Sequence, residues 1–358
     1  MMNFCRIATH EVDWERLDRF DDRVVFQTRE WVTFVAESQR AIPVIASLCD
    51  SGNIVGYFTG LVFSRMGVRV LGSPFPGWTT HYMGFNLQPH VRRWEALRAL
   101  ETFAFRDLKC LHLEISDLFS SEEEGASLGF TYELSHTLVT DLTQSEENIF
   151  GSMTGACRRC IRKAEKSGVR IAEARDEDFA EDYYEQLRQV FGRQSRVPTY
   201  GLDRVKQLLR HMLPTGHLLL LRALDPQGMC IATSIYVALN KIAVFWGNAS
   251  LRHSQYFRPN ELLNWHAMRY WKQRGLQVFD WGGGAHYGHY KAKYGGRPLS
   301  YPTFRKSRFA FVGSLRTVAN VLFKLNQRLL GWLQTGDNGP NRNTSLNSSG
   351  VLSKTLKP

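Results

Sequence analysis

Short apolar runs alternate with polar, turn-forming residues in the first third of the chain. Between residues 43 and 73, two turn-rich breaks separate three such runs, which predicts a three-stranded meander. Farther on, apolar residues recur at helical spacing from Trp94 to Ala104 and then alternate from Leu111 to Ile115. This second pattern predicts a helix followed by a strand.

The same order recurs in the second half. Three apolar runs between residues 217 and 250, separated by short turns, predict another meander. Residues 260–276 have helical spacing, and residues 277–283 ("QVFDWGG") indicate a strand. Two copies of one mixed unit indicate an internal duplication, although a meander followed by a helix is also common in unrelated α+β proteins. We therefore predict an α+β (mixed α/β) fold of tandem units, each a mostly antiparallel sheet flanked by helices.

The most basic short segment of the chain, residues 147–174, lies between the two copies. It predicts a helix that ends at Gly168 and is followed by a strand. Arg158, Arg159 and Arg162 on this helix are candidates to grip the phosphate of a nucleotide-linked or lipid-linked acceptor, and the alternative is a solvated cationic face. A Cys-x-x-Cys pair in the helix has neither a second pair for zinc nor a thioredoxin-like context, so we predict no metal or redox site.

Composition sets bounds on partners and location. The 358 residues suffice for about two domains. The net charge of +11 and the pI near 9.4 favour anionic partners, namely nucleic acid, phosphorylated small molecules or an anionic membrane surface. Six scattered cysteines and a start unlike a signal peptide predict a cytoplasmic protein. No run reaches the roughly 18 apolar residues that a membrane-spanning helix needs.

Three motifs follow one another in the second half: "RRCIRKAEKSGV", "RPNELLNWHAMRYWKQRGLQVFDWGGG" and "YKAKYGG". Together they resemble the FemAB-related branch of the GNAT acyltransferase superfamily, which includes the BioF2-like or CelD-like acetyltransferases. The shared features are an Arg-rich helix closing on Lys-Ser-Gly-Val, Pro-Asn-x-Leu-Leu at a helix start, an aromatic-Asp-x-Gly-Gly strand end, and an aromatic-Lys-x-x-aromatic-Gly tail. The motifs cover roughly residues 145–305, whereas the N-terminal half resembles the family's degenerate first unit in pattern alone.

The resemblance implies tandem GNAT-like units and transfer of an acyl or aminoacyl group to a primary amine. A BioF2-like member is expected to use acyl-CoA, in the first place acetyl-CoA, and a small-molecule or lipid-linked amine acceptor, such as a sugar, lipid, cell-envelope or exopolysaccharide precursor. The alternative is a Fem-type ligase, which takes an amino acid from charged tRNA and attaches it to a peptidoglycan precursor. Fem ligases often carry a coiled-coil arm for tRNA, and the absence of a sustained charged heptad run favours CoA. A third hypothesis is a basic binding module without catalysis.

Lys291 is the first catalytic candidate, in the glycine-rich stretch "FDWGGGAHYGHYKAKYGG" of residues 279–296. The resemblance implies that this lysine contacts the reacting acyl ester or its phosphate carrier, where a fixed cation would stabilise the oxyanion of a tetrahedral intermediate. Acylation of an amine also needs a proton acceptor. Asp280, His286 and His289 are the candidates, and an exposed surface position is the alternative for the two histidines.

The donor is expected at the start of the second predicted helix. Arg258 adds positive charge there, beside backbone N–H groups that can hold a pyrophosphate, in the place where the GNAT fold has its pyrophosphate loop. The usual Gln/Arg-x-x-Gly-x-Gly/Ala signature is absent, so a plain helix start is the alternative. The predicted contacts are, for the donor, Arg258, Asn260, Gly282, Gly283 and Tyr290, and, for the acceptor, Arg158, Arg159, Arg162, Trp246 and Tyr256.

We divide the chain into four parts. Residues 1–143 are predicted to form a degenerate GNAT-like unit, 144–305 the acyltransferase unit, 306–334 an amphipathic helix, and 335–358 a disordered polar tail. The amphipathic helix either docks on the protein's own core or lies on an anionic membrane. In the second case, the cytoplasmic protein would associate peripherally with the inner face of the membrane.

Overall fold

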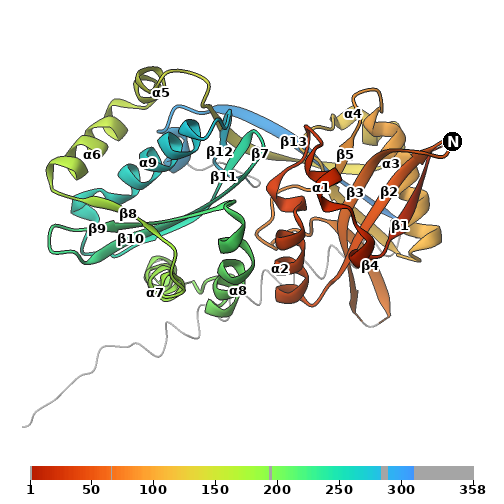
Figure 1. Cartoon of the computed structure of the whole chain (residues 1–358), viewed down its shortest axis with the longest axis horizontal. Coiled ribbons are helices and arrows are strands. Elements are labelled where there is room, and N and C mark those ends of the chain that lie inside the picture. Colours follow the sequence, from red (N-terminus) through yellow and green to blue (C-terminus); the bar gives the residue numbers. More distant parts are fainter. Residues whose placement is uncertain (1, 66, 193–195, 284–288, 310–358) are drawn as a thin grey trace, which may run out of the picture.

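A computed structural model describes residues 2–65, 67–192, 196–283 and 289–309. In this part of the chain the strands form one continuous 13-stranded sheet in the order β1-β2-β3-β4-β6-β13-β7-β12-β11-β10-β9-β8, and β5 pairs with β3 (Figure 1). The strands are β1 (Asn3–Ile7), β2 (Ile42–Asp50), β3 (Asn53–Arg65), β4 (Val68–Ser73), β5 (Phe85–Leu87), β6 (His112–Ser116), β7 (Thr131–Asp141), β8 (Arg170–Ala174), β9 (Leu218–Leu224), β10 (Cys230–Leu239), β11 (Ile242–Ser250), β12 (Val278–Asp280) and β13 (Arg297–Ser307).

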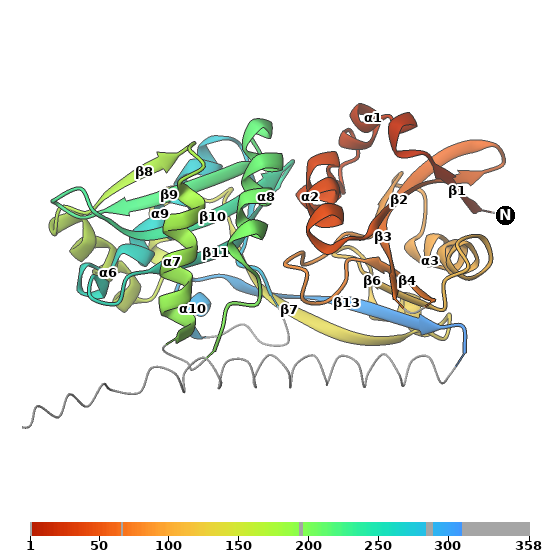
Figure 2. The ribbon, with the colours of Figure 1, turned by 90° about the horizontal axis from the view of Figure 1, so that it is seen from below.

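Helices cover both faces of the C-terminal part of the sheet, with α6 and α9 on one face and α7 and α8 on the other (Figures 1 and 2). The threonines that precede α2 and α6, Thr28 and Thr154, accept hydrogen bonds from first-turn amides and so cap these helices. None of the described helices is both long and apolar enough to span a membrane. The helices are α1 (Trp14–Asp18), α2 (Arg29–Gln39), α3 (Arg93–Thr102), α4 (Glu122–Ala126), α5 (Glu146–Ser152), α6 (Gly155–Lys166), α7 (Phe179–Gly192), α8 (Leu202–Met212), α9 (Pro259–Gln273) and α10 (His289–Ala292).

The predicted repeat is confirmed. β2, β3 and β4 form an antiparallel meander, α3 follows, and β6 returns parallel to β4. β9, β10 and β11 form the second meander, α9 follows, and β12 returns parallel to β11. The chain thus has the predicted mixed fold of tandem, mostly antiparallel units flanked by helices.

Two long strands join the sheets of the two halves. β7 pairs with β12 near Asp141 and with β13 along most of its length, and β13 lies antiparallel between β6 and β7 (Figure 2). A strand from late in the chain therefore completes the sheet of the N-terminal half. β13 extends to Ser307, past the predicted boundary at residue 305. The domain boundaries stay predictions, and residues 310–358, with most of the predicted amphipathic helix and the tail, lie outside the described residues.

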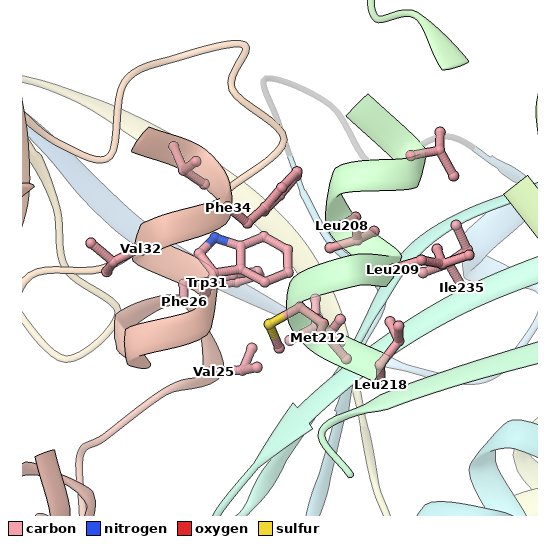
Figure 3. Close-up of a cluster of buried hydrophobic side chains, with 14 of the residues drawn as sticks. Val25, Phe26, Trp31, Val32, Phe34, Leu208, Leu209, Met212, Leu218 and Ile235 are labelled. Atoms are coloured by element: carbon pink, nitrogen blue, oxygen red, sulfur yellow. The ribbon is translucent and has the colours of Figure 1, made fainter. Parts of the chain in front are cut away.

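The two halves share one hydrophobic core where α2 meets α8 (Figure 3). Trp31 and Phe34 of α2 and Leu208 and Met212 of α8 are fully buried in it. Burial of one such side chain contributes about 1.5–3 kcal/mol, so this contact fixes one half against the other. The loop between β4 and β5, which adjoins this core, consequently keeps a defined position against the C-terminal half.

Candidate active site

β11 and β12 pair over a short distance and then part. Their parallel register ends with Val244 opposite Asp280. β11 continues to Ser250, and Trp246 is an extra, bulged residue in its ladder with β10. The chain turns away from β11 after the end of β12, and several of the predicted site residues lie at this turn.

Asp280 is buried at the end of β12, with 1% of its surface exposed. One carboxylate oxygen accepts hydrogen bonds from the Thr137 hydroxyl (2.5 Å) and the Gly282 amide (2.8 Å). The other oxygen accepts from the Tyr82 hydroxyl (2.9 Å). Three donors therefore hold the carboxylate in place, and its role as a proton acceptor stays a prediction.

The two predicted donor-binding glycines allow neighbouring protein segments to approach closely. Gly282 has a φ of +65°, and a β-carbon there would lie 2.9 Å from both the His81 Nε2 atom and the Phe245 carbonyl oxygen. A β-carbon on Gly283 would collide with the carbonyl of His136. Both positions need glycine for packing within the protein, and their contact with a donor stays a prediction.

Lys291 lies on the short helix α10, beside the same turn. Its Nζ atom donates a hydrogen bond to the Gly282 carbonyl (2.5 Å) and lies 5.4 Å from the centroid of the Phe245 ring. Burial lowers the pKa of Lys291, and the nearby Asp280 carboxylate opposes this shift. The site thus contains an oriented, partly buried cation. His286 and the side chain of His289 lie outside the described residues.

A network of tyrosine and asparagine side chains connects α10 to α9. Asn264 of α9 accepts a hydrogen bond from Tyr236 (2.8 Å) and donates to the hydroxyls of Tyr294 (2.9 Å) and Tyr290 (3.3 Å). Asn248 of β11 also donates to the Tyr290 hydroxyl (3.2 Å). The network fixes the predicted donor contact Tyr290 beside β11, and with it the helix that carries the catalytic candidate.

The start of α9 combines some features of an anion-binding helix end with one acidic residue, Glu261, whose carboxylate is paired with Lys293 (2.6 Å). Proline occupies its first turn, and Arg258, the residue before the helix, is exposed and makes no side-chain cap. The Asn260 side chain donates to the Ser250 hydroxyl (3.2 Å), and its Oδ1 atom has no hydrogen-bond partner among the described residues. The first-turn N–H groups therefore lack a side-chain acceptor of the kind that closes many helix starts.

The basic helix α6 begins with arginines in different situations. Arg158 donates hydrogen bonds to the carbonyls of Gly151 (2.6 Å) and Met153 (2.5 Å), which ties the end of α5 to α6. Arg162 is exposed and lies over the Phe150 ring, 5.4 Å from its centroid. Arg159 is exposed. Arg158 thus has a clear structural task, and a phosphate grip by these arginines stays a prediction.

The remaining predicted acceptor contacts, Trp246 and Tyr256, lie apart in the structure. The Trp246 indole donates to the backbone carbonyl of Thr79, a residue of the N-terminal half (3.1 Å). Tyr256, in the turn before α9, is 59% exposed and packs against the Phe257 ring at 4.1 Å between centroids. Trp246 therefore serves the junction between the halves, whereas Tyr256 leaves an aromatic face in solvent beside the start of α9.

Sequence reasoning missed the contribution of the N-terminal half to this site. The loop "PFPGWTTHYMG" between β4 and β5, residues 74–84, places His81 against Gly282 and Tyr82 on Asp280. Burial and the Lys291 ammonium lower the pKa of His81 to about 4, against the opposing effect of the Asp280 carboxylate. The available signal was compositional, because this loop, like the stretch around Lys291, combines glycines, aromatic residues and a histidine. Among the described residues, no group of three potential metal ligands gathers.

Comparison with known proteins finds a matching domain in the second half of the chain. Residues 152–292 match the model of the acetyltransferase (GNAT) domain. No curated protein sequence matches the chain. Among solved structures, FemX superimposes with a TM-score of 0.71 at 14% identity, covering 87% of this chain and 99% of FemX.

Two further structures have a similar fold at lower scores. The C-terminal domain (DUF2156) of a putative lysylphosphatidylglycerol synthetase from Agrobacterium fabrum has a TM-score of 0.52 at 13% identity, covering 88% of this chain and 98% of that domain. A tandem GNAT protein from the clavulanic acid biosynthesis pathway has a TM-score of 0.50 at 11% identity, covering 86% and 98%. Residues 152–292 of the chain therefore match a GNAT acetyltransferase domain, and the fold of the whole chain is similar to that of FemX and of a tandem GNAT protein.

Proposed function

We propose that the protein transfers an acyl group, in the first place acetyl, from acyl-CoA to a primary amine of a small-molecule or lipid-linked acceptor. The observation that carries this proposal is the partly buried Lys291 ammonium, held by the Gly282 carbonyl beside the end of β12. A cation fixed in this way, inside a GNAT domain, suits the stabilisation of negative charge on a reacting acyl group. The acceptor belongs to the sugar, lipid, cell-envelope or exopolysaccharide precursors.

The proposed reaction is a direct displacement. The amine nitrogen attacks the acyl carbonyl carbon, the carbonyl electron pair moves to oxygen, and Lys291 stabilises the resulting oxyanion. The intermediate then collapses, the carbon–sulfur bond breaks, and the electron pair leaves with the CoA sulfur. The amine gives up one proton and the departing thiolate can take one, so the products are an amide and free CoA.

The α9 start supports CoA as the carrier. Its first-turn amides have no side-chain cap, and Arg258 adds an exposed positive charge beside them. Backbone N–H groups at a helix start, together with the helix dipole, favour a pyrophosphate. Asn260 would contact the same part of the donor through its Nδ2 group, which in this structure donates to the Ser250 hydroxyl (3.2 Å).

A Fem-type transfer of an amino acid from charged tRNA to a peptidoglycan precursor is the second candidate. It is favoured by the likeness of nearly the whole chain to FemX in fold. The described helices are short, however, and the longest, α9, has 15 residues. No helix within residues 2–309, as far as the structure describes them, makes the extended coiled-coil arm expected of a tRNA-dependent ligase, so CoA remains the preferred donor.

Donor binding and transfer by purified protein test both candidates. Native mass spectrometry and thermal shift with acetyl-CoA, longer acyl-CoAs and charged tRNA identify the donor, and release of free thiol in the presence of an amine panel measures transfer. We expect an acyl-CoA to bind and Lys291→Ala to lower the transfer rate about 10²–10³-fold. Lys206→Ala is the matched control, because Lys206 of α8 is half-exposed and pairs with Glu181 of α7. Binding of charged tRNA alone would replace the CoA proposal by the Fem-type one.

We further propose that the protein acts in the cytoplasm, with peripheral association of the predicted helix 306–334 with the inner face of the membrane. The net charge of +11 supports attraction to anionic lipid. Sedimentation with anionic liposomes, compared with neutral liposomes and with a variant lacking residues 312–333, tests this part. Equal sedimentation of the full-length and shortened proteins would contradict it.

A further inference from the structure

The loop that carries His81 is anchored to both halves of the molecule. The indoles of Trp31 and Trp246 donate to Thr80 (3.1 Å) and Thr79 (3.1 Å), and the Tyr82 hydroxyl donates to Asp280 (2.9 Å). These contacts come from α2, β11 and β12. They fix the backbone on either side of His81, so the position of its imidazole is determined by the packing of one half on the other.

The imidazole itself has a defined direction. Its Nε2 atom lies 2.9 Å from the place that a β-carbon of Gly282 would occupy, and its ring packs edge-on against Phe26 with centroids 5.7 Å apart. Neither ring nitrogen of His81 takes part in a hydrogen bond among the described residues. The carbonyl of the same Gly282 accepts from Lys291. The His81 Nε2 atom and the Lys291 ammonium thus both lie next to Gly282.

Burial, more than the surrounding charges, lowers the pKa of His81 and keeps its imidazole neutral near pH 7. The charged groups that face it are the Asp280 carboxylate from β12 and the Lys291 ammonium from α10, and the hydroxyls of Tyr82 and Tyr301 lie close by. Burial and Lys291 lower the pKa of His81 to about 4, and Asp280 opposes them. One nitrogen of a neutral imidazole carries a lone pair that can accept a proton.

Asp280 is less suited to accept the proton, although it belongs to the aromatic-Asp-x-Gly-Gly motif. Its carboxylate already accepts hydrogen bonds from Thr137, Gly282 and Tyr82, and only 1% of the residue is exposed. A substrate amine would have to displace one of these donors to reach it. The arrangement makes Asp280 a positioning residue for the loop and for Gly282, whereas the ring nitrogens of His81 accept no hydrogen bond among the described residues.

We propose that His81, supplied by the N-terminal half, accepts the proton of the acceptor amine during acyl transfer. This inference rests on the proposed function. As the carbon–nitrogen bond forms, the N–H proton moves to the imidazole nitrogen, and the carbonyl electron pair moves to the oxygen beside Lys291. When the carbon–sulfur bond breaks, the electron pair goes to sulfur, and the imidazolium returns its proton to the thiolate or to water.

The experiment measures acyl transfer, donor binding and chemical rescue in the full-length protein. We expect His81→Ala to lower the transfer rate about 10²–10⁴-fold while the acyl-CoA still binds in native mass spectrometry, and added imidazole to restore part of the rate. His90→Ala is the matched control, because His90 is an exposed histidine of the same half. Rescue by imidazole separates proton transfer from a merely structural role.

The outcomes separate the two proposals. If wild-type protein transfers the acyl group and His81→Ala is equally fast, or is slow and does not respond to imidazole, His81 is not the proton acceptor and the proposed function stands. If folded wild-type protein transfers no acyl group from any acyl-CoA, the proposed function fails and this inference with it. If His81→Ala does not fold, His81→Gln decides in its place: it fills the site without a basic nitrogen, and a wild-type rate would overturn the proposal.

Discussion

The two copies of the repeated unit differ in the side chains at the start of the corresponding helices, α3 and α9. In the N-terminal copy, Arg93 in the first turn of α3 forms ion pairs with Asp22 (2.6 Å) and Asp117, and all three side chains are largely buried. In the C-terminal copy, no side chain caps α9, and Asn260 keeps an oxygen without a partner among the described residues. The first copy thus gathers two buried carboxylates around the first turn of its helix, which would repel an anionic donor, whereas the acidic residue in the first turn of α9, Glu261, is paired with Lys293 (2.6 Å).

The copies also differ after their third strand. β4 ends at Ser73, where its pairing with β6 ends, and the chain leaves in the loop 74–84. β11 continues to Ser250, past the end of its pairing with β12. The N-terminal loop reaches the place where β11 and β12 part and brings His81 and Tyr82 to it. In the proposed mechanism, the N-terminal copy therefore contributes to the reaction by supplying side chains to the other copy.

The largest effect on stability is expected from Arg93→Met, which removes the ion pairs at the start of α3. Removing the guanidinium leaves Asp22 and Asp117 buried and unpaired, which typically costs about 3–5 kcal/mol of folding free energy. Urea denaturation followed by tryptophan fluorescence measures the loss, and the transfer rate per folded molecule should not change. Arg92→Met is the control, because its side chain is exposed one residue earlier. Equal stability of both variants would show that the ion pairs of Arg93 at the start of α3 do not stabilise the fold.

Much of this architecture follows from local sequence patterns. The turns, the alternating apolar runs and Pro259 at a helix start specify both meanders and α9, because these signals act over a few residues. The motif around Lys291 indicated the end of β12 in the same way. Contacts between distant segments leave no such signal: Tyr82 and Asp280 are 198 positions apart, and β13 enters the sheet of the other half. The contribution of His81 depends on that long-range pairing and on the α2–α8 contact, which periodicity alone does not contain.

A smaller effect is expected from Tyr82→Phe, which removes the hydrogen bond between the two copies at Asp280. A hydrogen bond to a charged, buried group contributes about 1.5–3 kcal/mol, so the midpoint of urea denaturation should fall accordingly. Because the loop then loses an anchor beside His81, the transfer rate should fall as well. Tyr270→Phe is the control, since its ring contacts Arg274 and its hydroxyl makes no hydrogen bond among the described residues. A stability loss without any loss of rate would limit the role of Tyr82 to folding.

The smallest change, Asn260→Asp, tests the difference between the two helix starts directly. It adds a carboxylate to the first turn of α9, where the carboxylate already present, that of Glu261, is paired with Lys293 (2.6 Å). Negative charge near a helix start stabilises the helix by about 0.3–1 kcal/mol, so the melting temperature should stay the same or rise slightly. The same charge should repel the pyrophosphate and raise the dissociation constant of the acyl-CoA about tenfold, which corresponds to about 1.4 kcal/mol.

Gln273→Glu, at the exposed far end of the same helix, makes the same change in net charge and should leave binding unaltered. Weaker binding in Asn260→Asp alone would show that an open helix start distinguishes the catalytic copy, whereas equal binding in both variants would place the anion elsewhere in the C-terminal half.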